Sequence, residues 1–525
     1  MCYPLEEGGL GIRSIIKVNE SYNLKLAWDL HNSMESWAVL LRQRVLRKGC
    51  FIKHHINSSL WTSMKYEVST VEENTTWMVV NGSSINLWSD SWCGKPLLFA
   101  VLDISNIIEQ SVCSIISNGR WDFSKALFPI PLDLQERTLR CHIPIVPRPD
   151  GRVWTDSPNG DITAKISFNF KRSIGLCKDW WQWIWSKSIP PFKSAFVWKL
   201  LYCKVSTDEQ WHRRNFSFPS RCCLCKEAQE TTHHLFFNCK FASFLWSWLS
   251  KMLNISSPIL DWPDLWALCR KFGSGQCKIV STAAIVFILN AIWLARNRLK
   301  FQDAPPSIQS SISSIVDSVA LAGGSPTVGS FLNMQDFVML KNFHVPIRPR
   351  KAPNILEVIW KPPPRNWIKI NCDGTSSPSG LSACGGIARN SDGNFLGAFA
   401  DFLGVANSLI AELSGAMMAI EFAYEKNWSN IWLETDSTAV VKAFNSPYTV
   451  PWFIRNRWFN CISLVANWNF VVSHIYREGN SCADTLASLG LNITSSTYFA
   501  SIPICLRADF VKNRIGMPFY RFISS

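Results

Sequence analysis

The alternation of apolar and polar residues is most regular between residues 365 and 490. Apolar and polar side chains alternate from Ile368 to Asp373, a period of two that predicts a β-strand. Two further strands are predicted over 382–389 and 395–403, because the residues between these two stretches are typical of a tight turn. This part of the chain therefore begins with three predicted strands.

Helical and strand patterns then alternate as far as residue 490. Apolar residues recur at helical spacing from Leu413 to Tyr424, whereas 431–433 and 470–475 have the β-branched and aromatic residues of strands. Asn480 is a favourable N-cap for a last helix. The predicted order is three strands, a helix, a strand, a helix, a strand and a helix. It indicates a mixed, five-stranded α/β sheet flanked by helices within a multidomain chain.

Four of these predicted elements each carry a carboxylate. Asp373 ends the first strand, and Glu412 lies in the first turn of the first helix. Asp436 follows the fourth strand, and Asp484 lies near the start of the last helix. Clustered acids repel one another without a metal, and Mg²⁺ prefers carboxylate oxygens. The pattern predicts a divalent-cation site, although each acid taken alone could be a helix cap or a solvated charge.

The same residues carry a resemblance to type 1 ribonuclease H. The similarity is strongest to the form found at the C-terminal end of plant LINE-type retrotransposon polyproteins. It implies that the chain cleaves the RNA strand of RNA–DNA hybrids with two Mg²⁺ ions, or Mn²⁺ in their place, and that the first acid bridges both ions. The matching segments are Asn371–Gly374, Ala411–Glu412, Glu434–Ser437 and Arg477–Ala487.

Other interpretations of this region remain open. His474 could be a catalytic base, but it lies in a predicted strand, so we interpret it as structural, unlike the loop histidine of bacterial members of the family. A non-catalytic nucleic-acid-binding or scaffold remnant of a retroelement is the main alternative, and trimming of single strands is a third. Residues 367–490 carry seven Lys and Arg against ten Asp and Glu. No lysine-rich helix is predicted between Asp436 and Phe470, where Arg455 and Arg457 are the candidates for a basic substrate handle. We therefore expect weak hybrid binding by this part alone.

A second group of chemically informative residues precedes this region. Cys222, Cys225, His234 and Cys239 supply three thiolates and one imidazole, a closed tetrahedral set typical of structural zinc. The neighbouring Cys223 and His233 could be mistaken for ligands. Residues 180–239 resemble the zinc-binding domain of reverse transcriptases, and this resemblance assigns the ligand role to His234. A buried thiol cluster without metal is the alternative.

The zinc-binding region is also rich in basic residues and tryptophan. These residues could form a nucleic-acid face, with tryptophans for base stacking, or an ordinary solvated surface, and the sequence leaves both open. The whole chain has a formal net charge of +14, which favours a polyanionic partner. The basic residues concerned are Lys187, Lys193, Lys199, Lys204, Arg213, Arg214 and Arg221.

The N-terminal part resembles the segment that directly follows the polymerase in plant LINE-type reverse transcriptases, on the residues of 4–13 and 77–92. The chain has no Tyr-x-Asp-Asp run, so we expect a remnant without a polymerase. The predicted partition is 1–170 remnant, 171–255 zinc-binding domain, 256–303 helical extension, 304–364 linker, 365–490 ribonuclease H-like domain and 491–525 C-terminal extension.

Composition adds the expected compartment. The 18 cysteines are spread thinly and no secretory signal begins the sequence, so we expect reduced thiols in an intracellular protein that is not secreted, with the nucleus as one candidate compartment. The apolar run from Ile279 to Ala295 is short for a membrane span and predicts a buried helix instead. We expect nucleic acid as the partner, preferentially an RNA–DNA hybrid, and no membrane; no protein partner can be inferred.

Overall fold

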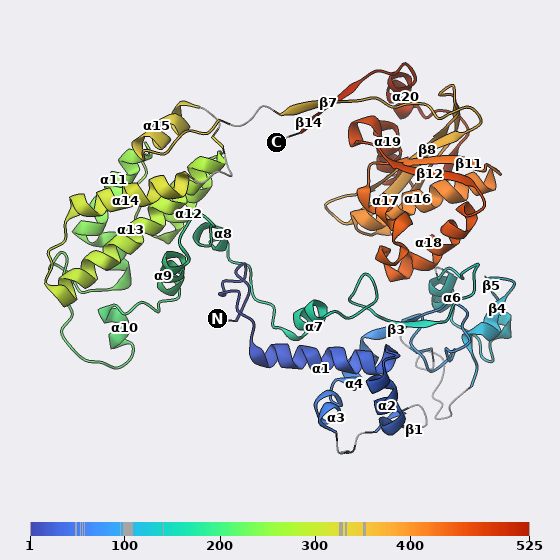
Figure 1. Cartoon of the computed structure of the whole chain (residues 1–525), viewed down its shortest axis with the longest axis horizontal. Helices are drawn as coiled ribbons and strands as arrows, with labels where there is room; N and C mark the ends of the chain where they lie inside the picture. The colour runs from blue at the N-terminus through green and yellow to red at the C-terminus, as the bar shows by residue number, and fades with distance from the viewer. Residues whose placement is uncertain are drawn as a thin grey trace. The chain divides into compact units, whose positions relative to one another are not determined.

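The computed structural model describes the chain except for residues 1, 48–49, 53, 55, 57, 95, 98–108, 140, 325–328, 331–332, 350–352 and 524–525. The chain divides into two compact units (Figure 1). The helical unit combines residues 1–14 with 173–354, and the sheet unit combines 15–172 with 355–523. Each unit is built from two segments that are distant in the sequence.

The helical unit is organised around one long apolar helix, α13. Every residue from Val280 to Asn290 is buried, so this helix is covered on all sides by its neighbours. It is long and apolar enough to cross a membrane, but 72% of its most apolar stretch is buried inside the unit, as in the core helix of a helical domain. The helices of this unit are α8 (Trp181–Ile184), α9 (Pro191–Leu201), α10 (Asp208–His212), α11 (Lys240–Met252), α12 (Trp262–Lys271), α13 (Gly275–Gln302), α14 (Ile308–Gly323) and α15 (Met334–Asn342), with a π-helix, η3, over His234–Asn238.

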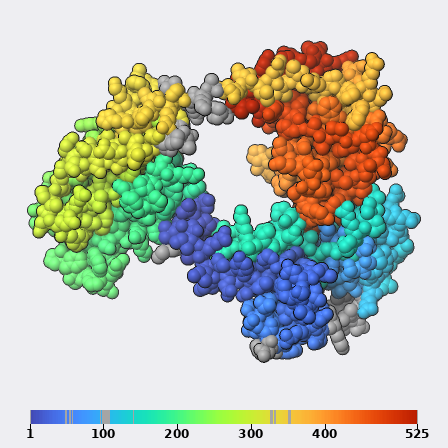
Figure 2. Space-filling view, in the orientation of Figure 1, coloured from blue at the N-terminus to red at the C-terminus, as the bar shows by residue number. Residues whose placement is uncertain are grey.

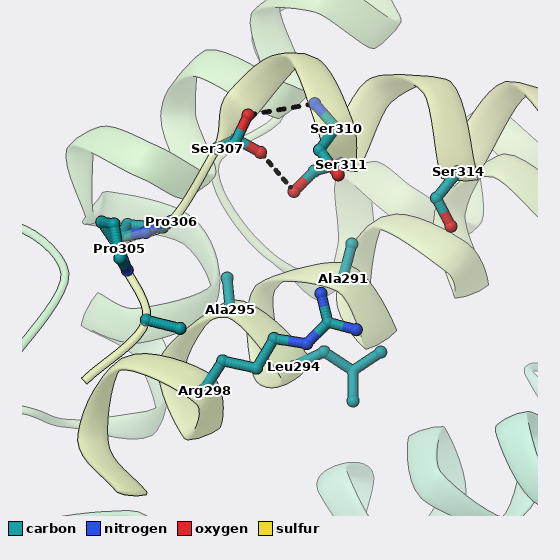
Figure 3. A pocket seen from close by; sticks show the side chains of 11 residues that line it. Ala291, Leu294, Ala295, Arg298, Pro305, Pro306, Ser307, Ser310, Ser311 and Ser314 are labelled. Atoms are coloured by element: carbon teal, nitrogen blue, oxygen red, sulfur yellow. Dashed lines mark hydrogen bonds between the residues drawn. The ribbon is translucent and has the colours of Figure 1, made fainter. Parts of the chain in front are cut away.

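Part of the region predicted as a linker is core. Ile315 and Val319 of α14 and Leu340 of α15 are buried in the same apolar cluster as α13. Ser307 begins α14, since its hydroxyl accepts a hydrogen bond from the Ser310 amide (3.2 Å), beside a cavity of about 200 Å³ between α13 and α14 (Figure 3). The Pro and Ser residues of 304–314 therefore mark a turn and a helix start, and a linker is wrong for this stretch.

The N-terminal part of the sheet unit contains short elements around two small aromatic cores. One core contains Trp28, Trp61 and Trp154, and the other contains Trp88 and Trp92. The elements are α1 (Ile15–Asn32), α2 (Ser36–Val45), β1 (Leu46–Arg47), β2 (Cys50–Phe51), α3 (Ser59–Met64), α4 (Val68–Glu73), β3 (Thr75–Met78), η1 (Val112–Ile115), β4 (Ile116–Ser117), β5 (Arg120–Trp121), η2 (Phe123–Lys125), α6 (Leu132–Leu139), β6 (Gly151–Trp154) and α7 (Ala164–Lys171).

The C-terminal part of the sheet unit is a mixed α/β sheet with the predicted order of elements, except that two helices, α17 and α18, lie between β11 and β12, where one was expected. Six strands follow the order β12-β11-β8-β9-β10-β13, in which β11 runs parallel to β8 and β12, and the remaining pairs are antiparallel. The space-filling view shows these orange to red residues closely packed (Figure 2). The strands are β8 (Ile368–Ser376), β9 (Leu381–Arg389), β10 (Phe395–Val405), β11 (Asn430–Thr435), β12 (Asn469–His474) and β13 (Thr497–Phe499), and the helices are α16 (Ser408–Glu425), α17 (Thr438–Asn445), α18 (Trp452–Val465) and α19 (Ser481–Gly490).

The mixed sheet has one strand more than the five expected. The additional strand, β13, comes from the predicted C-terminal extension and pairs with β10, whose free edge would otherwise expose unpaired backbone groups. The rest of the extension also packs on this part, because Leu506 and Phe510 are buried. The elements that complete it are η4 (Pro447–Thr449), η5 (Arg477–Gly479), η6 (Ile504–Leu506), α20 (Arg507–Arg514) and a two-stranded sheet of β7 (Asn354–Val358) with β14 (Phe519–Ile523).

Two glycines bring the helices that carry acids close to the sheet. A Cβ atom on Gly374 would lie 2.1 Å from the backbone of Ala411, so only glycine lets α16 approach β8 this closely. A Cβ atom on Gly385 would lie 2.6 Å from the backbone of Ala487, which sets the same requirement for α19 on β9. These contacts place the first turns of α16 against β8, which carries Asp373, and the second half of α19 against the neighbouring strand β9.

Candidate active site and metal centres

Three of the four predicted acids converge at one edge of the sheet. Asp373 lies on β8, Glu412 in the first turns of α16, and Asp436 directly after β11. One carboxylate oxygen of each acid lies within 4.8 Å of the other two. Because β8 and β11 are adjacent and parallel, their carboxyl ends meet at the same edge of the sheet, which brings Asp373 beside Asp436. We call these three residues the acid cluster.

Burial and mutual repulsion dominate the electrostatics of the acid cluster. Burial is the largest cause that raises the pKa of Asp373 to about 9, followed by the charges of Asp436 and Glu412. Burial and the charge of Asp436 raise the pKa of Glu412 to about 8. No described residue hydrogen-bonds to the buried Oε2 atom of Glu412. Hard oxygen donors that lack a protein partner and repel one another fit a divalent cation such as Mg²⁺.

The structure places the fourth predicted acid, Asp484, apart from the cluster. Its Oδ1 atom accepts a hydrogen bond from Nη2 of Arg477 at 2.7 Å. Its charge still raises the pKa of Asp373, so it lies near the cluster without completing it. The guanidinium of Arg477 therefore neutralises Asp484, whose side chain is 33% exposed. The first turn of α19 does carry Asp484, as predicted.

Asn480 is a functional candidate that sequence reasoning missed. It precedes α19, as expected of an N-cap, but its side chain makes no capping hydrogen bond. Instead its Nδ2 atom donates to the carbonyl of Cys372 (3.1 Å) and to Oδ1 of Asp436 (3.4 Å), while its Oδ1 accepts from Asn371 (3.2 Å). Asn480 therefore links β8, α19 and one member of the acid cluster. An asparagine can either cap a helix or orient a carboxylate, so no feature of the sequence distinguishes the two roles.

A buried polar network supports Asn480 through the side chain of Asn371. Lys369 is only 1% exposed, and its Nζ donates to Oε1 of Glu434 at 3.0 Å. Asn371 donates to Oε2 of the same glutamate (2.9 Å) and accepts from the indole of Trp360 (2.9 Å). The polar side of the β8 alternation is therefore buried as well as the apolar side. An intact network of this kind fixes the side chains that it contains.

His474 is the last residue of β12 and is exposed. Its Nε2 atom lies 3.1 Å from the backbone carbonyl of Asp436, to which it can donate. Its ring makes an edge contact with Tyr476, with the ring centroids 5.5 Å apart. The interpretation of His474 as structural stays a prediction.

The basic substrate handle expected on α18 is not available. Arg455 is buried and donates to the carbonyls of Val450 (3.1 Å) and Asn159 (2.8 Å). Arg457 makes a bidentate pair with Glu421, at 2.8 and 2.6 Å. Both guanidinium groups are therefore already satisfied within the sheet unit. The sequence could not show this, since each arginine pairs with a partner that is distant along the chain or on the backbone.

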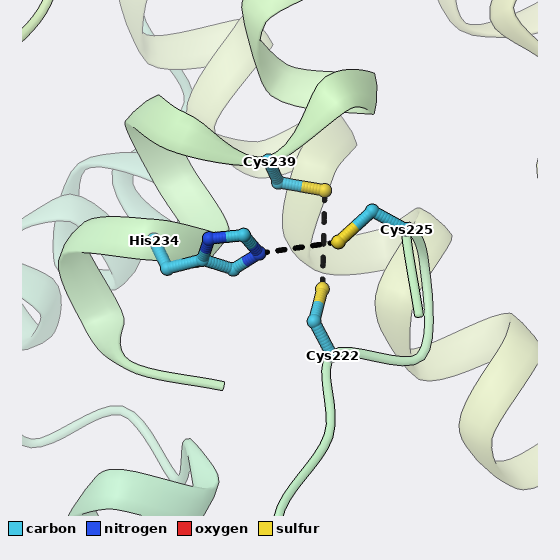
Figure 4. Close-up of side chains that lie close together, drawn as sticks. All are labelled: Cys222, Cys225, His234 and Cys239. Carbon is cyan, nitrogen blue, oxygen red and sulfur yellow. Dashed lines mark hydrogen bonds between the residues drawn. The ribbon is translucent and has the colours of Figure 1, made fainter. Parts of the chain in front are cut away.

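The predicted zinc ligands form a second, closed cluster in the helical unit. Cys222, Cys225, His234 and Cys239 each offer a ligand atom within 4.8 Å of the others, and all four point toward one another (Figure 4). The imidazole Nε2 lies 3.2 Å from Sγ of Cys225, and the sulfurs of Cys222 and Cys239 are 3.8 Å apart. His234 begins the π-helix η3, and Cys239 directly follows it. Three soft sulfurs and one imidazole fit tetrahedral zinc and leave no open position.

The neighbours of the zinc ligands point elsewhere. Sγ of Cys223 contacts the carbonyl of Arg296 at 3.8 Å, and His233 lies 3.8 Å from Asp261. A hydrogen bond with Cys239 is the largest cause that lowers the pKa of Cys222 to about 5. The same hydrogen bond raises the pKa of Cys239, so the two thiols titrate as a pair.

Two family models match the regions of the chain that contain these two residue clusters. Residues 371–490 match the family model described as "Reverse transcriptase-like", and residues 163–246 match "zinc-binding in reverse transcriptase". The chain therefore combines a ribonuclease H-like domain with a reverse-transcriptase zinc-binding region. These matches confirm the predicted resemblance and fold class, and they support a nuclease of the ribonuclease H type.

Three proteins to which the chain is similar carry ribonuclease H in their names. The Arabidopsis thaliana protein named "Putative ribonuclease H protein" is 24% identical over 572 aligned positions, which cover 98% of this chain and 84% of that protein. The ribonuclease H1 of Halobacterium salinarum is 26% identical over 24% of this chain and 98% of its own, with a TM-score of 0.22. LC11-RNase H1, solved with an RNA/DNA hybrid, is 21% identical over 24% of this chain and 96% of its own, with a TM-score of 0.22.

Proposed function

We propose that the ribonuclease H-like domain hydrolyses the RNA strand of RNA–DNA hybrids with two bound Mg²⁺ ions. The observation that carries the proposal is the acid cluster, in which three carboxylates on three elements converge and Oε2 of Glu412 has no partner among the described residues. Asp373, Glu412 and Asp436 would hold the ions, with Asp484 at the rim. Bound ions of this kind activate a water and stabilise the leaving oxygen of an in-line displacement.

The protein's own residues have separate tasks in this proposal. Asp373 and Glu412 exchange protons for metal, because their raised pKa values keep protons on the empty cluster near neutral pH. Asn480 orients Asp436 through its hydrogen bonds to β8. Arg477 holds Asp484 at the rim, and because its guanidinium is exposed there, it can also contact a phosphate of the substrate.

A structural role for zinc completes the proposal. The closed Cys₃His set would tie the loop after α10 to the start of α11, because its ligands precede and follow η3. Zinc held by four protein ligands stabilises the fold and offers no position for a reacting water. The helical unit would therefore need zinc for folding and not for hydrolysis.

The test uses the full chain, purified with its zinc, and a duplex with RNA in one strand and DNA in the other. We expect cleavage of the labelled RNA strand when Mg²⁺ is added, and no cleavage in Mg²⁺-free buffer or with Asp373→Asn. The exposed turn variant Asp392→Asn is the matched control and should cleave normally. RNA products formed equally by Asp373→Asn would remove the assignment of the site.

A non-catalytic nucleic-acid-binding remnant is the second candidate. The observation that favours it is the pairing of Asp484 with Arg477, which keeps one family acid out of the cluster. In that case the chain would bind the hybrid and leave the RNA strand intact at any Mg²⁺ or Mn²⁺ concentration.

A further inference from the structure

An aromatic groove is lined by residues of α10, of the loop that follows it and of the last turns of α13 in the helical unit. Its cavity has a volume of about 490 Å³, within the range of pockets that hold small ligands. Five aromatic side chains line it, namely Trp211, Phe216, Phe218, Trp293 and Phe301. None of these residues belongs to the acid cluster or to the zinc ligands.

The rims of this groove expose large aromatic surfaces to solvent. Phe301 is 72% exposed, Phe216 is 54% exposed and Phe218 is 37% exposed. Phe216 also packs edge-to-face against Trp211, with the ring centroids 5.0 Å apart. Single exposed apolar residues are common, but several aromatic rings around one cavity mark a binding surface. The helical core does not need these three phenylalanines, because they lie outside its buried cluster.

The floor of the groove is rigid and charged. Arg296 is 2% exposed and donates to Oε1 of Glu230 at 2.6 Å, while Lys300 donates to Asp208 at 2.5 Å. The Arg296 guanidinium lies 4.9 Å from the centre of the Trp293 ring. The carbonyl of Arg296 contacts Cys223, which lies between two zinc ligands in the sequence. The groove is therefore anchored both by buried ion pairs and by the zinc loop.

The charge around the groove favours an anionic partner. Residues 173–354 carry 21 Lys and Arg against 10 Asp and Glu, so most of the net charge of +14 lies in this segment. Arg214 is exposed and lies 5.4 Å from the centre of the Trp211 ring, whereas Arg296 and Lys300 of the lining are already paired with Glu230 and Asp208. Aromatic platforms flanked by cations are the arrangement with which proteins hold unpaired nucleic acid, by base stacking and phosphate contacts.

We propose that this groove binds single-stranded RNA or DNA, with unpaired bases stacked on the exposed rings and a phosphate beside Arg214. A paired base cannot reach such a ring, so the groove selects single strands over duplexes. Stacking on an aromatic face tolerates any base and either sugar, so RNA and DNA should bind comparably. This binding site goes beyond hybrid hydrolysis and does not depend on the acid cluster.

The test measures the affinity of the full, zinc-loaded chain for fluorescently labelled 12-nucleotide oligo(U) and oligo(dT). The chain carries Asp373→Asn, so that the affinity is measured without cleavage. Phe216→Ala and Phe301→Ala should each weaken binding about tenfold, because stacking on one ring is lost. Phe244→Ala is the matched control, since Phe244 of the same unit is 50% exposed, close to the 54% of Phe216, and lies on α11 outside the groove lining.

The salt dependence separates stacking from charge. Arg214→Met should lower the slope of log Kd against log salt by about 0.7, the value for one phosphate contact on a single strand, whereas Phe301→Ala should leave this slope unchanged. Unchanged affinity in both phenylalanine variants, an equal loss in Phe244→Ala, or equal binding of a blunt duplex would each overturn the proposal. Cleavage assays on the chain with Asp373 intact report on hydrolysis separately, so failure of one proposal is distinguishable from failure of the other.

Discussion

The two candidate metal centres of this chain, the Cys₃His set and the acid cluster, differ in how they should behave without metal. In the helical unit, thiols and an imidazole approach one another as hydrogen-bonding partners, so the empty set is held together. In the sheet unit, the carboxylates of the acid cluster are close together and repel one another. Their burial and this repulsion raise the pKa values of Asp373 and Glu412, so protonation lowers the repulsion. The first centre is closed by four protein ligands, and the second leaves a carboxylate oxygen unpartnered among the described residues. The comparison indicates that the Cys₃His set is a structural metal site and that the acid cluster exchanges its metal ions.

The largest expected effect concerns the exchangeable site. Asp373→Asn and Asp436→Asn each remove a charged ligand, so cleavage of the RNA strand should fall at least about a thousandfold, a loss of roughly 4 kcal/mol of transition-state stabilisation. Gel analysis of end-labelled hybrids measures it, and circular dichroism confirms folding. A loss of less than tenfold in a folded variant would contradict the assignment of these two acids.

The next effect concerns the structural site. Cys222→Ser should release zinc and lower the Tm of the helical unit by more than about 10 °C, because the ligand set stabilises the fold when metal is bound. Zinc content by elemental analysis and Tm by calorimetry are the measurements. Cys223→Ser is the matched control, since that thiol points to the carbonyl of Arg296 and should retain zinc. Equal zinc loss in both variants would contradict the assignment of Cys222, and not Cys223, as a zinc ligand.

A smaller effect is expected at the residue that orients Asp436. Asn480→Ala should weaken Mg²⁺ affinity about 10- to 100-fold, as loss of a hydrogen bond behind a metal ligand does. Ser307→Ala removes a cap of α14 in the other unit and should cost about 1 kcal/mol of stability with Mg²⁺ affinity unchanged. Calorimetric titration separates the two outcomes. If Asn480→Ala changed only stability, Asn480 would be a structural residue.

The pH dependence of the metal-free protein follows from the raised pKa values. Asp373 and Glu412 titrate near 3.8 and 4.5 when unfolded but at about 9 and about 8 in the fold. Between these values the folded state binds more protons, so stability should fall as pH rises from about 4 to about 9. Asp373→Asn should make the loss of stability with rising pH smaller, and saturating Mg²⁺ should make stability rise with pH instead. A Tm that rose through this window in metal-free buffer would contradict the raised values.

The smallest effect is expected at α18. Arg457→Met should change hybrid affinity less than about twofold, because the guanidinium is already paired with Glu421 and carries little free charge to the substrate. Fluorescence anisotropy at two salt concentrations measures it. A tenfold weaker complex would show that α18 does contact nucleic acid.

Much of the acid cluster could be predicted from the sequence. Asp373 and Asp436 end strands, and the carboxyl ends of adjacent parallel strands lie at one edge of a sheet, so their positions along the chain imply their proximity. Glu412 could be placed because the helical spacing after it is regular. The sequence placed Asp484 on its helix. Its ion pair with Arg477 could not be predicted, because a side chain seven residues away has many possible partners.

The remaining surprises have a common physical origin. Lys369 alternates with apolar residues and would face solvent in a half-exposed strand, but Glu434 from the neighbouring strand neutralises it inside the fold. The Ser- and Pro-rich stretch before α14 has the composition of a linker, but Ile315 and Val319 of this helix complete the core around α13. β13 is too short to show a strand pattern and forms only because β10 offers an unpaired edge. Tertiary partners decided each of these cases.

The contrast between the two centres is tested most directly by dialysing the full chain against metal-free buffer without a strong chelator, followed by elemental analysis and an RNA–DNA hybrid cleavage assay. We predict that about one zinc per chain is retained, that cleavage is absent, and that Mg²⁺ alone restores it. Cleavage that persists without Mg²⁺, or that returns only when zinc is added, would contradict the division of roles between the acid cluster and the Cys₃His set.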